Sequence, residues 1–74
     1  MTINERIEKA EAIKAAATKI NATAGNAIRI WSKGDNVRIY TDGNGYTSIE
    51  SDGSINYIKR QGWGHIITEA IETL

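Results

Sequence analysis

The segment from Ala27 to Thr41 constrains the fold of this 74-residue chain more than any other. Its sequence, AIRIWSKGDNVRIYT, alternates β-branched or aromatic residues with other types on both sides of a Lys-Gly-Asp-Asn cluster. This pattern is typical of a β-hairpin with a short turn. A register in which Trp31 faces Arg38 makes one face of the hairpin aliphatic. The opposite face then interleaves arginines with aromatic rings.

Two further turn signals follow the hairpin closely. Asp-Gly-Asn-Gly begins at Asp42 and Ser-Asp-Gly begins at Ser51, and both are rich in the residues that favour turns. The short spacing predicts an antiparallel meander and leaves no room for crossover helices. A register in which Tyr40 faces Tyr46 keeps aromatic and aliphatic residues on separate faces. The two expected strands are Tyr46–Glu50 and Ser54–Arg60.

A long helix is expected before the hairpin. Thr2 and Glu5 form a T-x-x-E capping box, so the helix should start at Ile3. We expect Glu5 to pair with Lys9 on the exposed side, and Gly25 with Asn26 to end the helix. The alanine-rich apolar stripe suits packing on the sheet or against the same helix of another copy. The stripe consists of Ile3, Ile7, Ala10, Ile13, Ala17, Ile20 and Ala24.

A short second helix is expected near the C-terminus, where apolar residues recur at helical spacing from Ile66 to Leu74. It is too short to persist without support, so both helices should cover the aliphatic face of the sheet. The prediction is therefore a single small α+β domain over residues 1–74. It has an N-terminal helix, a four-stranded antiparallel meander and a short C-terminal helix in a two-layer sandwich.

Composition narrows the functional classes. The chain has no cysteine, which excludes disulfides and thiolate metal sites, and its small core favours homo-oligomerisation. Nine basic residues balance nine acidic ones, which argues against binding duplex DNA through bulk charge. No apolar run approaches the roughly 18 residues that cross a bilayer. We therefore expect a soluble, cytoplasmic protein without membrane association.

The candidate ligand-binding residues share the outer face of the predicted sheet. Their rings can stack on a ligand, and their guanidinium groups can bind phosphate or carboxylate. The same residue types are enriched at protein interfaces, and they also decorate solvent-facing sheets. A ligand platform, a protein interface and a plain surface are therefore all open at this point. The residues are Arg29, Trp31, Arg38 and Tyr40, extended by Tyr46 and Arg60.

Other residues with chemical potential have simpler explanations. His65 should cap the last helix or face solvent, and no Ser, Cys or carboxylate constellation accompanies it. Asp42, Asn44 and Asp52 fit turns rather than a calcium loop, because the required Gly and Glu positions hold other residues. Trp63, between two glycines, is a better core anchor than a lid. We expect no cofactor, no metal and no enzymatic activity.

In its size, its lack of cysteine, its abundance of Asn, Ile and Lys, and its helix-then-meander layout, the chain resembles small proteins encoded by phages and mobile elements. Several such families are counter-defence proteins that sequester nucleotide second messengers or occlude a nuclease complex. The resemblance implies a homo-oligomeric binding protein of the host cytoplasm that holds a nucleotide-like or anionic ligand. The alternative is a protein-binding inhibitor that occludes a host effector such as a nuclease complex.

Overall fold

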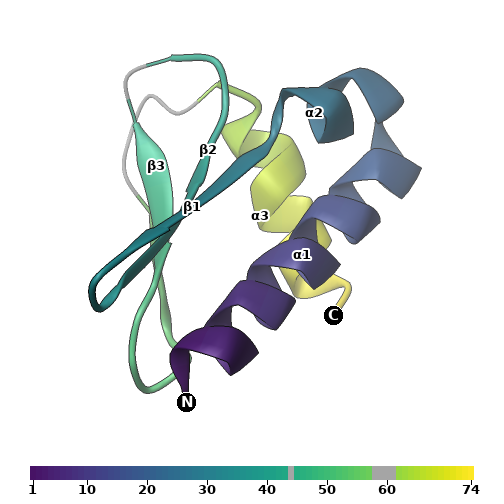
Figure 1. The fold of residues 1–74 in the computed structure, drawn as a ribbon. Coiled ribbons are helices and arrows are strands. Elements are labelled where there is room, and N and C mark those ends of the chain that lie inside the picture. The colour runs from purple at the N-terminus through teal and green to yellow at the C-terminus, as the bar shows by residue number, and fades with distance from the viewer. Residues whose placement is uncertain (44, 58–61) are drawn as a thin grey trace.

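A computed structural model describes residues 1–43, 45–57 and 62–74. Across these residues the chain forms an N-terminal helical region, a four-stranded antiparallel sheet and a short C-terminal helix, which confirms the predicted fold class (Figure 1). The elements are α1 (Ile3–Ile20), α2 (Ala22–Ala27), β1 (Arg29–Lys33), β2 (Asn36–Tyr40), β3 (Tyr46–Ile49), β4 (Ile55–Tyr57) and α3 (Gly64–Glu72).

The sheet is a simple meander with strand order β1-β2-β3-β4. Trp31 faces Arg38 across the first hairpin, and Tyr40 faces Tyr46 across β2 and β3, so both predicted registers are confirmed. Gly34 has a φ of 57° in the first turn, a conformation that glycine adopts without a side-chain penalty. The described part of β4 is Ile55–Tyr57, and its predicted continuation to Arg60 lies outside the described residues.

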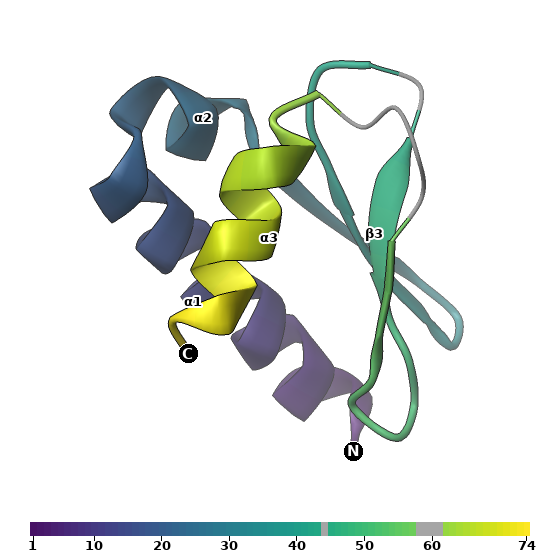
Figure 2. The same ribbon diagram turned by 180° about the vertical axis from the view of Figure 1, so that it is seen from behind.

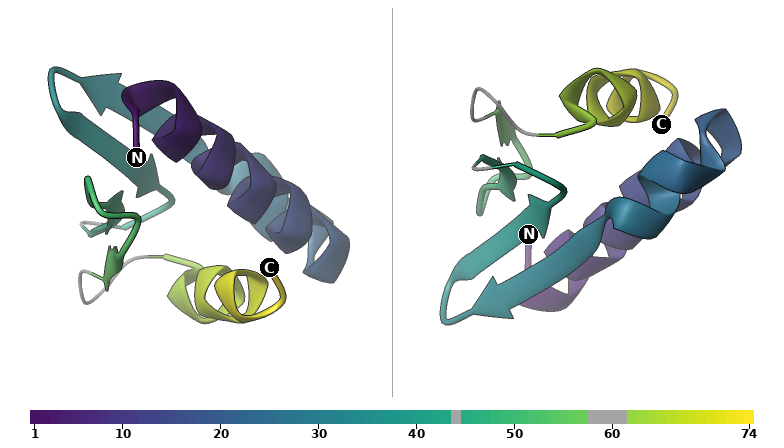
Figure 3. Two further views of the ribbon diagram at one scale, coloured as in Figure 1. Left: turned by 90° about the horizontal axis from the view of Figure 1, so that it is seen from below. Right: turned by 90° about the horizontal axis from the view of Figure 1, so that it is seen from above.

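Helices α1 and α3 lie on one face of the sheet, which gives two layers (Figures 2 and 3). Helix α1 packs against β1, β2 and α3, so its buried stripe is used within the chain. The outer face of the sheet is left for the candidate site. The core consists of Ala10, Ile13, Ala17, Ala24, Ile28, Val37, Ile39, Ile49, Ile66, Ile67 and Ala70.

The first helix ends earlier than predicted, and the expected stop at Gly25 and Asn26 is wrong. Asn21 takes an extended conformation and accepts a hydrogen bond from the Ala24 amide through its side chain, which starts the separate helix α2. Gly25 is buried inside α2, where a Cβ atom would collide with Thr18 of α1. The glycine therefore serves close packing of two helices rather than a left-handed cap.

The predicted Glu5–Lys9 pair is also wrong. The Glu5 carboxylate accepts a hydrogen bond from the Thr2 amide, which completes the capping box. Lys9 instead reaches across to the β3–β4 turn, where its Nζ donates to the Gly53 carbonyl at 2.8 Å. Lys9 therefore bonds to a backbone carbonyl of the sheet layer instead of to Glu5 on its own helix.

Helix α3 begins after Trp63, which is the non-glycine residue with positive φ (59°) in the described chain. Trp63 packs partly buried against the core, as expected for a core anchor. Its neighbour Gly62 lies against the Asp42 backbone and accepts a hydrogen bond from the Thr41 hydroxyl. His65 is exposed, in agreement with the solvent-facing prediction.

Candidate functional site

The outer face of the sheet collects the residues predicted from the sequence. Trp31 and Arg38 are directly opposite each other, as are Arg29 and Tyr40, and Tyr46 lies beside Tyr40 on β3. We call these five residues the Arg/aromatic face. Arg29 and Trp31 are exposed, whereas the other three are half-buried. The sixth predicted residue, Arg60, lies outside the described residues.

Arg38 occupies the centre of the Arg/aromatic face. Its Cζ lies 4.3 Å from the ring centre of Tyr46 and 5.1 Å from that of Trp31, both within cation–π range. Its Nη1 donates a hydrogen bond of 3.2 Å to the hydroxyl of Tyr40. Three aromatic side chains from β1, β2 and β3 therefore fix one guanidinium group.

The rings also contact one another. Trp31 and Tyr40 form an edge-to-face pair with centroids 6.2 Å apart, and Tyr40 and Tyr46 form a tilted pair at 5.5 Å. These are favoured aromatic geometries, so each ring limits the rotation of its neighbour. The face is a preorganised surface rather than a set of independent side chains.

The surroundings of Arg38 favour its positively charged form. The hydrogen bond to the Tyr40 hydroxyl raises the pKa of Arg38 above its ordinary value, and nearby Glu50 adds a smaller effect in the same direction. Among the described residues, no carboxylate forms a salt bridge with Arg38, and its Nε is buried without a hydrogen-bond partner. The group therefore stays cationic and has no salt-bridge partner within the described chain.

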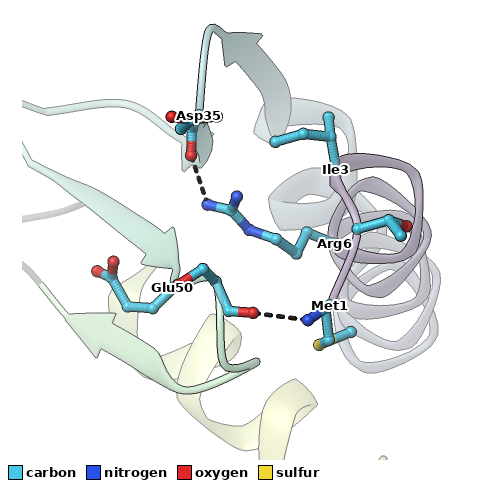
Figure 4. Close-up of a pocket in the computed structure, with 7 residues that line it drawn as sticks. Met1, Ile3, Arg6, Asp35 and Glu50 are labelled. Atoms are coloured by element: carbon cyan, nitrogen blue, oxygen red, sulfur yellow. Dashed lines mark hydrogen bonds between the residues drawn. The ribbon is translucent and has the colours of Figure 1, made fainter.

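A second feature was missed from the sequence. Arg6 of α1 is 4% exposed and points into a pocket of about 590 Å³ at the end of the sheet. The pocket lies between the start of α1, the first hairpin turn and the end of β3, and Figure 4 shows Arg6 reaching across it. The spacing of residues 6, 10, 13 and 17 places Arg6 in the buried stripe, which is the signal that could have revealed it.

An apolar groove of about 540 Å³ runs between α1 and the C-terminal end of α3. Ala12, Ala15 and Ile20 form one wall, and Leu74, which is 59% exposed, forms part of the other. Lys19 lies at its edge. The groove exposes apolar surface on the helical layer, away from the Arg/aromatic face.

Among the described residues, no group of three or more His, Cys, Asp or Glu side chains could hold a metal ion. Asp52 acts as a turn residue, because its carboxylate accepts a hydrogen bond from the Ser54 amide.

None of the helices in the described residues combines the length and the apolar character needed to cross a bilayer. No protein-family model, curated protein or solved structure matches this chain.

Proposed function

We propose that this is a non-enzymatic binding protein that holds a nucleotide-like anionic ligand on the Arg/aromatic face. The observation that carries the proposal is the Arg38 guanidinium, fixed between Trp31 and Tyr46 without a carboxylate partner in the described chain. Aromatic rings stack on bases, and guanidinium groups bind phosphates. Arg29, exposed beside Tyr40, supplies a second positive charge.

Preorganisation favours a ligand platform over a plain surface. Ordering a long flexible side chain on binding costs about 0.5–1.5 kcal/mol. Arg38 already has its position fixed by two rings and one hydroxyl, so a ligand need not supply that ordering. Trp31 is 36% exposed, so part of this residue stays available for contact with a ligand.

Two native mass spectra test the proposal. The first is recorded on the protein as purified from bacteria, and the second after denaturation and refolding in clean buffer. We expect a bound nucleotide-sized mass that is lost on refolding and restored by adding the compound. The double variant Arg29→Ala/Arg38→Ala should abolish the restored binding. Lys14→Ala, which removes a cation from α1 outside both the Arg/aromatic face and the helix face that carries Lys19, is the matched control and should bind normally. Unchanged binding by the double variant would place the ligand elsewhere.

The second candidate is a protein-binding inhibitor that uses the same face to occlude a host effector. The exposed Trp31 beside Arg38 and Tyr40 favours it, because Trp, Tyr and Arg dominate binding hot spots. A stoichiometric protein partner in pull-down experiments, lost in Trp31→Ala and unaccompanied by a small molecule, would support this function. Either function fits the counter-defence role that the resemblance implies.

We further propose that the protein is a homo-oligomer, and specifically a homodimer that pairs through α1. Glu8, Ala12, Ala15 and Lys19 follow a 4-3-4 spacing and share one exposed helix face. An antiparallel two-fold axis centred between Ala12 and Ala15 places Glu8 opposite Lys19 of the partner subunit, and the symmetry repeats this pair. The apolar groove and Leu74 would add buried surface at this interface.

A further inference from the structure

The N-terminal end of α1 presents a buried positive charge that the Arg/aromatic face does not use. We propose that the pocket around Arg6 binds an oxyanion head group, a carboxylate or a phosphate, through Nη1 of Arg6. The site faces the helical layer and the first hairpin turn. The inference stands independently of the function proposed for the outer face of the sheet.

Arg6 is buried without a carboxylate partner among the described residues. It is 4% exposed, and its hydrogen-bond acceptors are all backbone carbonyls. Ile49 accepts from Nε at 2.9 Å and from Nη2 at 2.7 Å, and Asp35 accepts from Nη2 at 2.8 Å. No carboxylate of the described residues forms a salt bridge with it. Buried charges are ordinarily paired with an opposite charge, so an anion would complete this site.

The donor count shows which atom would bind the anion. A guanidinium group has five N–H donors, one on Nε and two on each terminal nitrogen. Nε and Nη2 are engaged by Ile49 and Asp35, whereas Nη1 has no hydrogen bond within the described chain. Figure 4 shows one terminal nitrogen on the Asp35 carbonyl and the other directed away from it. Nη1 can therefore offer both of its hydrogens to a ligand.

The start of α1 reinforces the positive field. Ile3 lines the pocket as the first residue of this 18-residue helix, and helix N-termini favour anions. Neither acidic residue of the pocket lining forms a salt bridge with Arg6. Asp35 binds Arg6 through its carbonyl, and Figure 4 shows the Glu50 carboxylate directed away from the guanidinium.

The size of the pocket sets the ligand class. A volume of about 590 Å³ falls within the range of roughly 300–1,000 Å³ found for small-molecule sites. It exceeds the volume of one phosphate or carboxylate, so the head group would carry a small organic body. The single free nitrogen suits one oxyanion rather than a chain of phosphates.

Nitrogen-15 NMR titrations test the site with sodium phosphate and sodium acetate, each compared with sodium chloride at equal ionic strength. We expect saturable shifts at the Arg6 side chain and at the Ile3 and Asn4 amides with phosphate or acetate. The anion that saturates the shifts at lower concentration identifies the head group. Shifts that match those in chloride for both anions would overturn the proposal.

Two variants keep the test independent of folding. Ile3→Asp places a carboxylate at the pocket, where the helix N-terminus favours an acidic residue. Because Ile3 also packs partly buried against the core, circular dichroism must first show a wild-type spectrum for this variant. It should weaken anion binding by about tenfold or more. Lys9→Met, the control, removes a cation bonded to Gly53 outside the pocket lining and should bind normally. Equal effects of the two variants, or none from Ile3→Asp, would overturn the site.

Discussion

Gly25 and Gly34 are each required for a different physical reason, and the stability of substituted variants distinguishes the two reasons. Gly25 lacks room for a side chain, because a Cβ atom would meet Thr18. Gly34 has open space around it but a φ of 57°. The first is a packing requirement between α2 and α1, and the second is a conformational requirement of the hairpin turn.

We predict that Gly25→Ala lowers the free energy of unfolding by about 1–3 kcal/mol through overpacking. Gly34→Ala should cost about 1–2 kcal/mol because alanine disfavours the left-handed region, and Gly34→Asn should cost less. Urea denaturation at one temperature measures all three variants. Gly25→Ala with wild-type stability would mean that α2 does not pack on α1 as described.

Arg6 shows what single-residue patterns leave out. Its place in the stripe of residues 6, 10, 13 and 17 could have been predicted from helical spacing. Its charge argued for the exposed side, because arginine is rarely buried. The carbonyls that make burial possible come from Asp35 and Ile49, 29 and 43 residues later in the chain. No local pattern contains that information.

Secondary-structure elements were predictable where their signals are local. The hairpin follows from two-residue alternation around one turn, so its register could be written down before the structure was known. The break after α1 could not, because the apolar stripe continues past Asn21 into α2. The capping by Asn21 and the close approach of Gly25 to Thr18 outweigh the continuing pattern.

Two carboxylates, one at the start of α1 and one in the β3–β4 turn, make the stability of the fold sensitive to acid. The pKa of Glu5 lies below its ordinary value of 4.5, because its carboxylate accepts the hydrogen bond from the Thr2 amide. The pKa of Asp52 is lowered from 3.8 by hydrogen bonds from Ser54. A lowered folded-state pKa stabilises the fold fully above the ordinary value, and the stabilisation disappears as the pH falls through the folded value.

We therefore expect the melting temperature to fall below about pH 4 as these two carboxylates become protonated. Glu5→Gln should flatten part of this decline, because glutamine can keep the cap without titrating. Glu11→Gln removes an exposed carboxylate from the middle of α1 and should retain the wild-type decline. Thermal unfolding followed by circular dichroism across the acid range decides the matter. An unchanged decline in Glu5→Gln would exclude the cap as a cause.

At the scale of the whole molecule, the sequence predicted the α+β layout and the five described residues of the Arg/aromatic face. It did not predict that Arg38 would lie between Trp31 and Tyr46, because side-chain directions depend on the twist of three strands together. It also left open whether α1 packs within or between subunits. The structure uses one side of α1 for its own core and leaves another side exposed.

The proposed dimer predicts a charge-swap result. Glu8→Lys alone and Lys19→Glu alone should each weaken self-association, because each places like charges opposite one another at both ends of the interface. The double variant restores opposite charges and should recover dimerisation. Sedimentation velocity over a range of protein concentrations measures the effect. A dimer that is insensitive to all three variants, or a monomer at every concentration, would refute the interface.

The long-range ties of α1 have a consequence for synthesis on the ribosome. Helix α1 leaves the exit tunnel before the strands, yet Arg6 and Lys9 bond to carbonyls of Asp35, Ile49 and Gly53, the last of these 44 residues after Lys9. An isolated helix of this length is marginal in water. Helix α1 therefore cannot complete its packing until the β3–β4 turn has also left the ribosome. Helix α1 would emerge before the sheet yet become fixed only together with it.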